Sequence, residues 1–117
     1  MNYSMSGREE DEFYALLLAK ADEARRVLNY PFSEFLDQLH RHGAYRTAAS
    51  KLGRIRSDEF AELASAGRLD LSLEAQVVNT KWRACFDPAL VAMAESRLRE
   101  HGYAGEKSGS DLSFGQI

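Results

Sequence analysis

Glycine and proline interrupt this chain at short intervals, and the segments between them repeat apolar residues with the period of an α-helix. The first apolar stripe contains Phe13, Leu17, Ala21, Ala24 and Leu28. Ser6 and Glu9 stand ahead of it with the spacing of a capping box, in which each residue satisfies a backbone N–H near the start of a helix. We therefore predict a first helix over residues 8–29.

Three further helices are predicted from the same kinds of signal. Pro31 fits the first turn of a helix that Gly43 would end in a left-handed conformation. Gly53 would end the next, alanine-rich helix in the same way. Ser57 is a predicted N-cap for the fourth helix, and Gly67 would stop it.

The stretch 67–82 is dense in apolar residues and contains the alternating Leu69, Leu71 and Leu73. Alternation is typical of a β-strand, but no other segment offers a partner strand, and a lone strand would leave its backbone hydrogen bonds unmet. We therefore predict an extended connector that places Leu69 and Leu71 in the core. Asp70 or Ser72 would cap a short helix after it.

The last helix has the clearest ends. Asp87 followed by Pro88 predicts its start, and Gly102 its end, with Tyr103 packing back onto the helix. Its predicted inner face consists of Leu90, Met93, Ala94 and Leu98. Residues 104–117 are rich in glycine and serine and poor in apolar residues, which predicts a flexible tail.

Together these patterns predict an all-α fold. We expect a single compact orthogonal bundle of about six short helices over residues 1–103, and a flexible tail over residues 104–117. A chain of 117 residues can bury such a core without metal or disulfide staples. The predicted centre of the bundle contains Leu71, Leu73, Val77 and Trp82.

One motif in this chain resembles a known family. The matching positions are Tyr30-Pro31-Phe32, the run Gly67-Arg68-Leu69-Asp70-Leu71-Ser72-Leu73-Glu74-Ala75, Phe86, and Leu98 through Gly102-Tyr103. They resemble an uncharacterised bacterial and phage family of small all-helical proteins and accessory domains. The resemblance covers about residues 28–103. It implies an all-helical, cytoplasmic, bacterial or phage protein, and it implies no activity.

Metal and thiol chemistry have little support. His40 and His42 lie two residues apart on a predicted helix, so they point in different directions and cannot share an ion. We predict no metal and no cofactor. Cys85 is the only cysteine, which favours a reducing compartment. No signal sequence is recognisable, so we predict a cytoplasmic protein, with Cys85 as a small buried apolar residue.

Paired carboxylates are the remaining catalytic hypothesis. Asp70 and Glu74 could act as acid and base, with Arg68 as a charged partner. We interpret them instead as a helix cap and an ion pair that fix the connector, and we predict that the protein is not an enzyme.

A basic segment supports a nucleic-acid hypothesis. Between residues 41 and 56 the charged residues are Arg41, Arg46, Lys51, Arg54 and Arg56. Five cations without an acid are notable in a chain of net charge -3, because such asymmetry can form a local phosphate-binding face. The following helix begins with Asp58 and Glu59, which disfavours its insertion into a DNA groove. The alternative is a solvated face that balances acidic helices.

The leading functional hypothesis is a non-enzymatic binding protein: an adaptor, regulator or inhibitor that contacts another protein, with nucleic-acid-processing machinery as the candidate setting. The alternative is direct, mostly nonspecific nucleic-acid binding through the basic segment 41–56. No membrane partner is expected. Aromatic residues that could anchor a partner are Tyr3, Tyr14, Tyr45, Tyr103 and Phe114. A second open possibility is that the tail itself docks through Leu112, Phe114 and Ile117.

Overall fold

The computed structural model describes residues 3–53 and 58–103, and all regular structure in these ranges is helical. The helices are α1 (Gly7–Leu28), α2 (Ser33–His42), α3 (Ala44–Leu52), α4 (Asp58–Ser65), α5 (Leu73–Val77) and α6 (Pro88–Glu100). Two 3-10 turns, η1 (Leu69–Leu71) and η2 (Arg83–Cys85), flank α5. The described chain therefore confirms the all-α, six-helix prediction, although α1 is a long helix of 22 residues. The predicted cap at Ser57 and the tail 104–117 lie outside the described residues.

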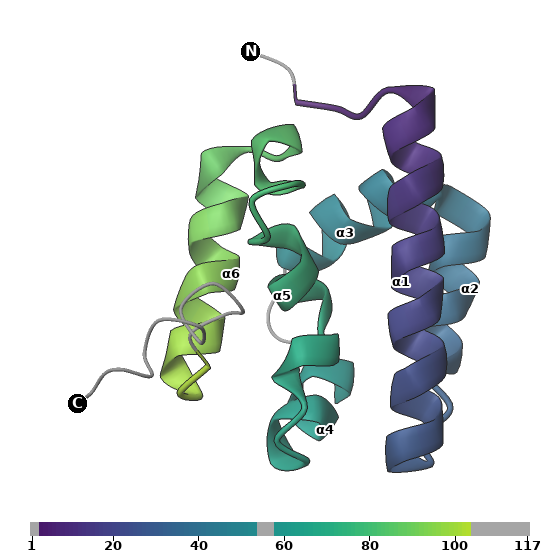
Figure 1. Cartoon of the computed structure of the whole chain (residues 1–117), viewed down its shortest axis with the longest axis vertical. Helices are drawn as coiled ribbons and strands as arrows, with labels where there is room; N and C mark the ends of the chain where they lie inside the picture. Colours follow the sequence, from purple (N-terminus) through teal and green to yellow (C-terminus); the bar gives the residue numbers. More distant parts are fainter. Residues whose placement is uncertain (1–2, 54–57, 104–117) are drawn as a thin grey trace.

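The helices are arranged in three groups, with a central group between two outer ones (Figure 1). Helices α1 and α2 lie together at one side of the molecule and α6 lies at the other, with α3, α4 and α5 between them. Helix α3 runs across the direction of α1, as expected for an orthogonal arrangement. Within the described ranges, no helix combines the length and apolar character that spanning a bilayer requires.

Several helix ends match the prediction because their signals are local. The Ser6 hydroxyl accepts a hydrogen bond from the Glu9 N–H at 3.1 Å, and the Ser6 N–H donates to the Glu9 carboxylate at 2.9 Å. At the end of α6, Gly102 has a φ of +78°, and the Tyr103 N–H donates to the Leu98 carbonyl at 2.9 Å. These bonds pair backbone groups that a helix end would otherwise leave unsatisfied.

Other predicted details are wrong. Helix α2 begins at Ser33, so Pro31 precedes its first turn, and the residue between them, Phe32, takes a left-handed conformation with φ +55°. Gly53 ends α3 in a right-handed conformation, with φ −80°. The connector at Leu69–Leu71 is a 3-10 turn rather than an extended segment, which satisfies its backbone locally. Both of these leucines are nevertheless buried, and Ser72 caps α5 as predicted.

Helix α6 turns a different face inward from the predicted one. Ala94 and Leu98 are buried as expected, but Met93 is exposed, and Val91 is buried together with the charged Arg97. The cause is an ion pair, described below, that brings the arginine inward. An apolar pattern alone does not indicate such a residue.

A long-range cap joins α1 to α3. The Glu10 carboxylate accepts hydrogen bonds from the N–H groups of Ala44 at 2.5 Å and Tyr45 at 3.1 Å. Gly43 makes room for it, since a Cβ atom there would lie 2.8 Å from the Glu10 Oε2 atom, and its φ is +86°. The Glu10 carboxylate lies at the N-terminal end of α3, where a negative charge interacts favourably with the helix dipole.

The core consists of two apolar clusters rather than one centre. The first joins α1, α2, α3, α5 and α6, and includes Phe13, Leu17, Leu39, Leu52, Val77, Trp82 and Phe86. The second surrounds Phe60, and includes Ala24, Phe32, Leu63, Leu69, Leu71 and Leu98. Leu71 and Val77 therefore belong to different clusters, and Leu73 is only partly buried. Helix α1 contributes to both clusters and links them.

Candidate functional site

The basic segment is partly neutralised by acids that lie outside it. The Arg41 guanidinium lies 3.2 Å from the carboxylate of Asp37, one turn earlier on α2. The Lys51 ammonium lies 3.6 Å from the Glu59 carboxylate of α4, and these side chains are only 15% and 12% exposed. Arg46 is exposed on α3. Arg54 and Arg56 lie outside the described residues.

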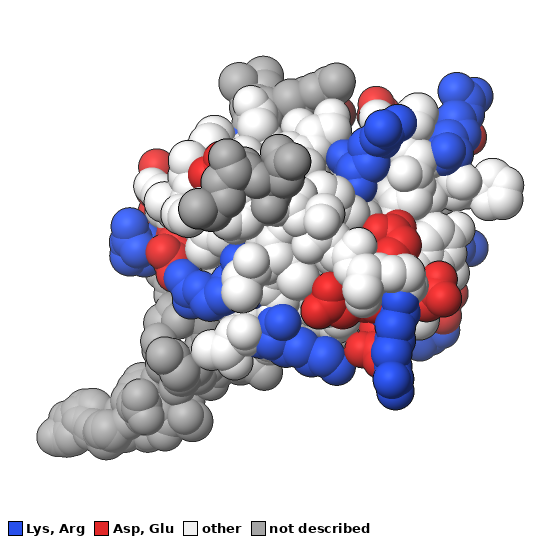
Figure 2. Space-filling view, turned by 90° about the horizontal axis from the view of Figure 1, so that it is seen from above, with Lys and Arg blue, Asp and Glu red and all other residues white. Residues whose placement is uncertain are grey.

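Figure 2 shows the molecule from above, and on this face lysine and arginine side chains lie in separate places with acidic side chains among them. A phosphate-binding face needs several neighbouring cations that are not already paired. Of the predicted cations that the structure describes, Arg41 and Lys51 are paired, so the segment does not form one continuous set of free charges.

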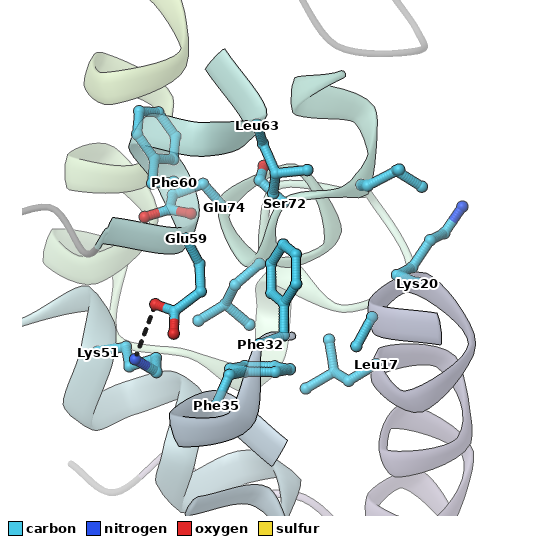
Figure 3. Close-up of a pocket in the computed structure, with 13 residues that line it drawn as sticks. Leu17, Lys20, Phe32, Phe35, Lys51, Glu59, Phe60, Leu63, Ser72 and Glu74 are labelled. Carbon is cyan, nitrogen blue, oxygen red and sulfur yellow. Dashed lines mark ion pairs between the residues drawn. The ribbon is translucent and has the colours of Figure 1, made fainter. Parts of the chain in front are cut away.

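A small apolar hollow lies where the two core clusters meet. Five elements enclose it: α1, α2, α4, η1 and the start of α5, with α3 at its edge (Figure 3). Its apolar lining consists of Leu17, Ala21, Phe32, Phe35, Phe60, Leu63, Leu71 and Leu73. Its polar lining consists of Lys20, Lys51, Glu59, Ser72 and Glu74. We call this site the hollow.

An unusual backbone conformation positions one wall of the hollow. Phe32 has a φ of +55°, which is rare for a bulky side chain and costs free energy. This conformation directs the ring into the hollow, beside Phe35 (Figure 3). Tyr30 packs edge-on against the Phe32 ring, with the ring centroids 4.9 Å apart. Strain of this kind is a known marker of functional sites, so it draws attention to this wall.

The charged wall is held by internal pairs. The Lys51–Glu59 pair spans α3 and α4, and the Lys51 ammonium lies 5.9 Å from the centre of the Phe35 ring. Behind it, the buried Glu74 carboxylate accepts a hydrogen bond from Arg97 at 3.2 Å, and Arg97 also donates to the Leu52 carbonyl at 3.2 Å. Burial raises the pKa of Glu74, while its own backbone hydrogen bond and Arg97 act in the opposite direction.

The proposed acid and base do not meet in this site. Asp70 accepts two hydrogen bonds from Arg68, at 2.9 and 3.0 Å, and Arg68 also donates to Glu23 at 3.1 Å. The hydrogen bonds from Arg68 hold the pKa of Asp70 below its usual range. Glu74 instead pairs with Arg97. The two carboxylates therefore have separate partners: Asp70 forms the expected ion pair with Arg68, whereas Arg97, the partner of Glu74, was not predicted.

The lone thiol also has a structural position. Cys85 is buried in the first cluster, and burial raises the pKa of its thiol, with a smaller contribution from the Glu9 charge. A raised pKa disfavours the reactive thiolate form at neutral pH. Across the described ranges, no three histidine, cysteine, aspartate or glutamate side chains are grouped as metal binding would require.

The size of the hollow decides what it can accept. Its volume is about 30 Å³. By a comparable measure a single water needs roughly 10–15 Å³, so the hollow has room for the end of one aliphatic side chain. A drug-sized ligand needs a pocket of about 300–1,000 Å³. The hollow therefore suits an anchor residue of a partner protein better than a cofactor or metabolite.

Two broader grooves open more widely to solvent. One, of about 370 Å³, runs between Tyr3 and the start of α6, where Arg83 and Glu95 already form an ion pair at 2.6 Å. The other, of about 340 Å³, lies at the end of α1 beside Asn29 and Tyr30. The first groove has an apolar wall of Phe86, Pro88, Val91 and Ala92, but both grooves are more open than the hollow.

The sequence contains only a weak signal for the hollow. Its members come from distant segments, and each follows an ordinary core pattern. Pro31 restricts the residue before it, Tyr30, so the left-handed conformation of Phe32, which follows the proline, could not be expected from it.

Comparison with known proteins adds no identification. No protein-family model matches the chain, and no curated protein or solved structure resembles it closely enough to support an argument. The resemblance to a bacterial and phage helical family therefore stays a prediction, and function must be argued from the hollow itself.

Proposed function

We propose that the chain is a non-enzymatic binding protein that docks a partner protein at the hollow. The observation that carries this proposal is an enclosed apolar hollow, with the volume of one side-chain end, at the junction of the two core clusters. Protein interfaces concentrate their binding energy in a few anchor residues that fill pockets of this kind.

The polar lining supports binding rather than catalysis. Lys51 pairs with Glu59, Glu74 pairs with Arg97, and Ser72 caps α5. Within the described ranges, no buried side-chain nitrogen or oxygen lacks a hydrogen-bond partner. A catalytic group must be able to exchange protons or bonds with a substrate, whereas these groups are already engaged by the fold. The single, buried cysteine is compatible with work in the reducing cytoplasm.

Direct nucleic-acid binding is the second candidate, because Arg41 and Arg46 are exposed on consecutive helices. Lys51 would not join a face formed by these two arginines, because it is largely buried and paired with Glu59, and Arg54 and Arg56 lie outside the described residues. Phosphate contact through such a face would be mostly nonspecific and strongly salt-dependent.

Site-directed photo-crosslinking separates the two candidates. A photo-reactive amino acid replaces Lys20, which lines the hollow, in one full-length variant, and the exposed Met93 of α6 in a matched control. Each variant is irradiated in a lysate of the cells that naturally make the chain. We expect a discrete protein adduct from position 20, resistant to nuclease, and none from position 93.

Three results would contradict docking at the hollow. The first is equal labelling from both positions, and the second is the absence of a protein adduct from position 20. The third is a nuclease-sensitive adduct obtained only when the photo-reactive group replaces Arg46, which would favour the nucleic-acid candidate.

A further inference from the structure

Among the residues that the structure describes, the α4 side of the hollow carries acids and no base. All charged residues of α4 are acidic: Asp58, Glu59 and Glu62. Phe60 and Leu63 of the same helix line the hollow (Figure 3). Because Glu59 is occupied by Lys51, the acids of α4 that face solvent are Asp58 and Glu62.

A fourth acid comes from α2. Glu34 is exposed in the first turn and lies in the sequence between Phe32 and Phe35, which line the hollow. Tyr30 packs on the Phe32 ring. Burial raises the pKa of Tyr30 most, and the charges of Glu59, Asp58, Glu62 and Glu34 raise it further. Glu34 is the sequence neighbour of Phe35, Asp58 of Glu59 and Glu62 of Leu63, so these three exposed acids flank lining residues of the hollow on α2 and α4. Within the described part of the chain, Glu34, Asp58 and Glu62 form no ion pair.

The charges on the other sides are largely compensated. Arg68 is shared between Asp70 and Glu23, and the Lys20 charge acts on Asp70. Lys51 is paired with Glu59. A partner that approaches the hollow therefore meets unpaired carboxylates at the α2–α4 edge.

We propose that the docked segment is a basic stretch of the partner protein, in which one aliphatic side chain enters the hollow and neighbouring lysine or arginine residues meet Glu34, Asp58 and Glu62. This inference rests on the proposed function, and it specifies the chemistry of the partner. Opposite charges around an apolar anchor would fix the direction of the segment and accelerate its association.

The same charges disfavour two other occupants. Residues 104–117 contain Glu106 and Asp111 against a single base, Lys107, so the chain's own tail has the wrong sign for this edge. Nucleic acid would bring phosphates against the same carboxylates, and like charges at close range repel. A basic protein segment is the occupant whose charge complements the edge.

The test is a selection of random peptides of fixed length on the full-length protein. We expect the enriched peptides to carry a net positive charge and a leucine, isoleucine or valine. Their affinity should fall as salt is added, because exposed charge pairs are screened. The double variant Asp58→Lys/Glu62→Lys should weaken binding by about tenfold or more, since attraction becomes repulsion.

The matched control is Asp11→Lys/Glu100→Lys, which makes the same change in net charge at exposed positions of α1 and α6. It should change the affinity by less than about twofold. Equal thermal midpoints by circular dichroism would show that both variants are folded. Equal losses of affinity in the two double variants would overturn the inference.

The remaining outcomes separate this inference from the proposed function. If the enriched peptides are neutral or acidic but crosslink to position 20, the inference fails and docking at the hollow stands. If no peptide is enriched, or if the peptides crosslink to position 93 instead, both fail.

Discussion

Replacing Phe13 with alanine should remove about 3–5 kcal/mol from the free energy of unfolding. Phe13 is 0% exposed, and its ring lies 5.0 Å from the Trp82 ring and 5.8 Å from the Phe86 ring, measured between centroids. The substitution removes the ring that joins α1 to the segment around η2, and it leaves a cavity. A domain of this size is stable by only about 5–15 kcal/mol, so much of the fold's stability would be lost.

Urea denaturation followed by helical circular dichroism measures this loss. Leu18→Ala is the matched control, because Leu18 lies on the same helix but is 40% exposed. Its cost should stay below about 1 kcal/mol. Similar losses for Phe13→Ala and Leu18→Ala would show that the first cluster is not packed as described.

Replacing Arg97 with methionine should cost about 3–5 kcal/mol at neutral pH. The substitution leaves the buried Glu74 carboxylate without its cation, and the Leu52 carbonyl without a donor that joins α6 to the end of α3. Replacing both members of the pair, as Glu74→Leu/Arg97→Met, should recover most of the lost free energy of unfolding, because well-packed apolar residues can replace a buried ion pair at little cost.

The stability lost in the Arg97→Met variant should depend on pH. Burial already raises the pKa of Glu74, and loss of Arg97 should raise it further. The folded state then holds a proton that the unfolded chain releases, so stability falls as the pH rises through the folded pKa and is regained at lower pH. Urea denaturation at neutral and mildly acidic pH should therefore show a smaller loss under acidic conditions. A loss independent of pH, or a double variant no better than Arg97→Met, would contradict this account of the pair.

Local signals account for most of the fold that the sequence predicted. The capping box at Ser6 and the glycine at Gly102 act within one helical turn, so their spacing in the chain is also their spacing in space. The alternation of Leu69 and Leu71 correctly indicated burial, although the backbone forms a 3-10 turn instead of an extended connector.

The wrong or missed features depend on contacts between distant residues. No local pattern gives Glu10 a role outside α1, yet it caps α3 from more than thirty residues away. Met93 lies three residues after Leu90, and Arg97 lies four residues after Met93, so spacing alone does not show which of the two is buried. Only the buried partner Glu74 determines that Arg97 turns inward. Spacing along one segment cannot reveal a partner on another.

The candidate site also depends on contacts between distant residues, which the sequence pattern does not show. Charge counting singled out Arg41, Arg46 and Lys51, but it could not show that Asp37 and Glu59 neutralise two of them. The hollow was not predicted, because it forms only when five elements meet and one residue, Phe32, takes a left-handed backbone conformation. Its acidic edge likewise combines residues of α2 and α4.

The most direct test of docking at the hollow is methyl chemical-shift mapping of the full-length protein with labelled leucines. The tightest-binding peptide from the selection is titrated into it. We predict that the largest shifts fall on Leu17, Leu63 and Leu71, which line the hollow, while the exposed Leu18 stays unchanged. Shifts concentrated on Leu18, or on Leu90 at the start of α6, with the three hollow leucines unmoved, would contradict the proposal that this protein binds its partner there.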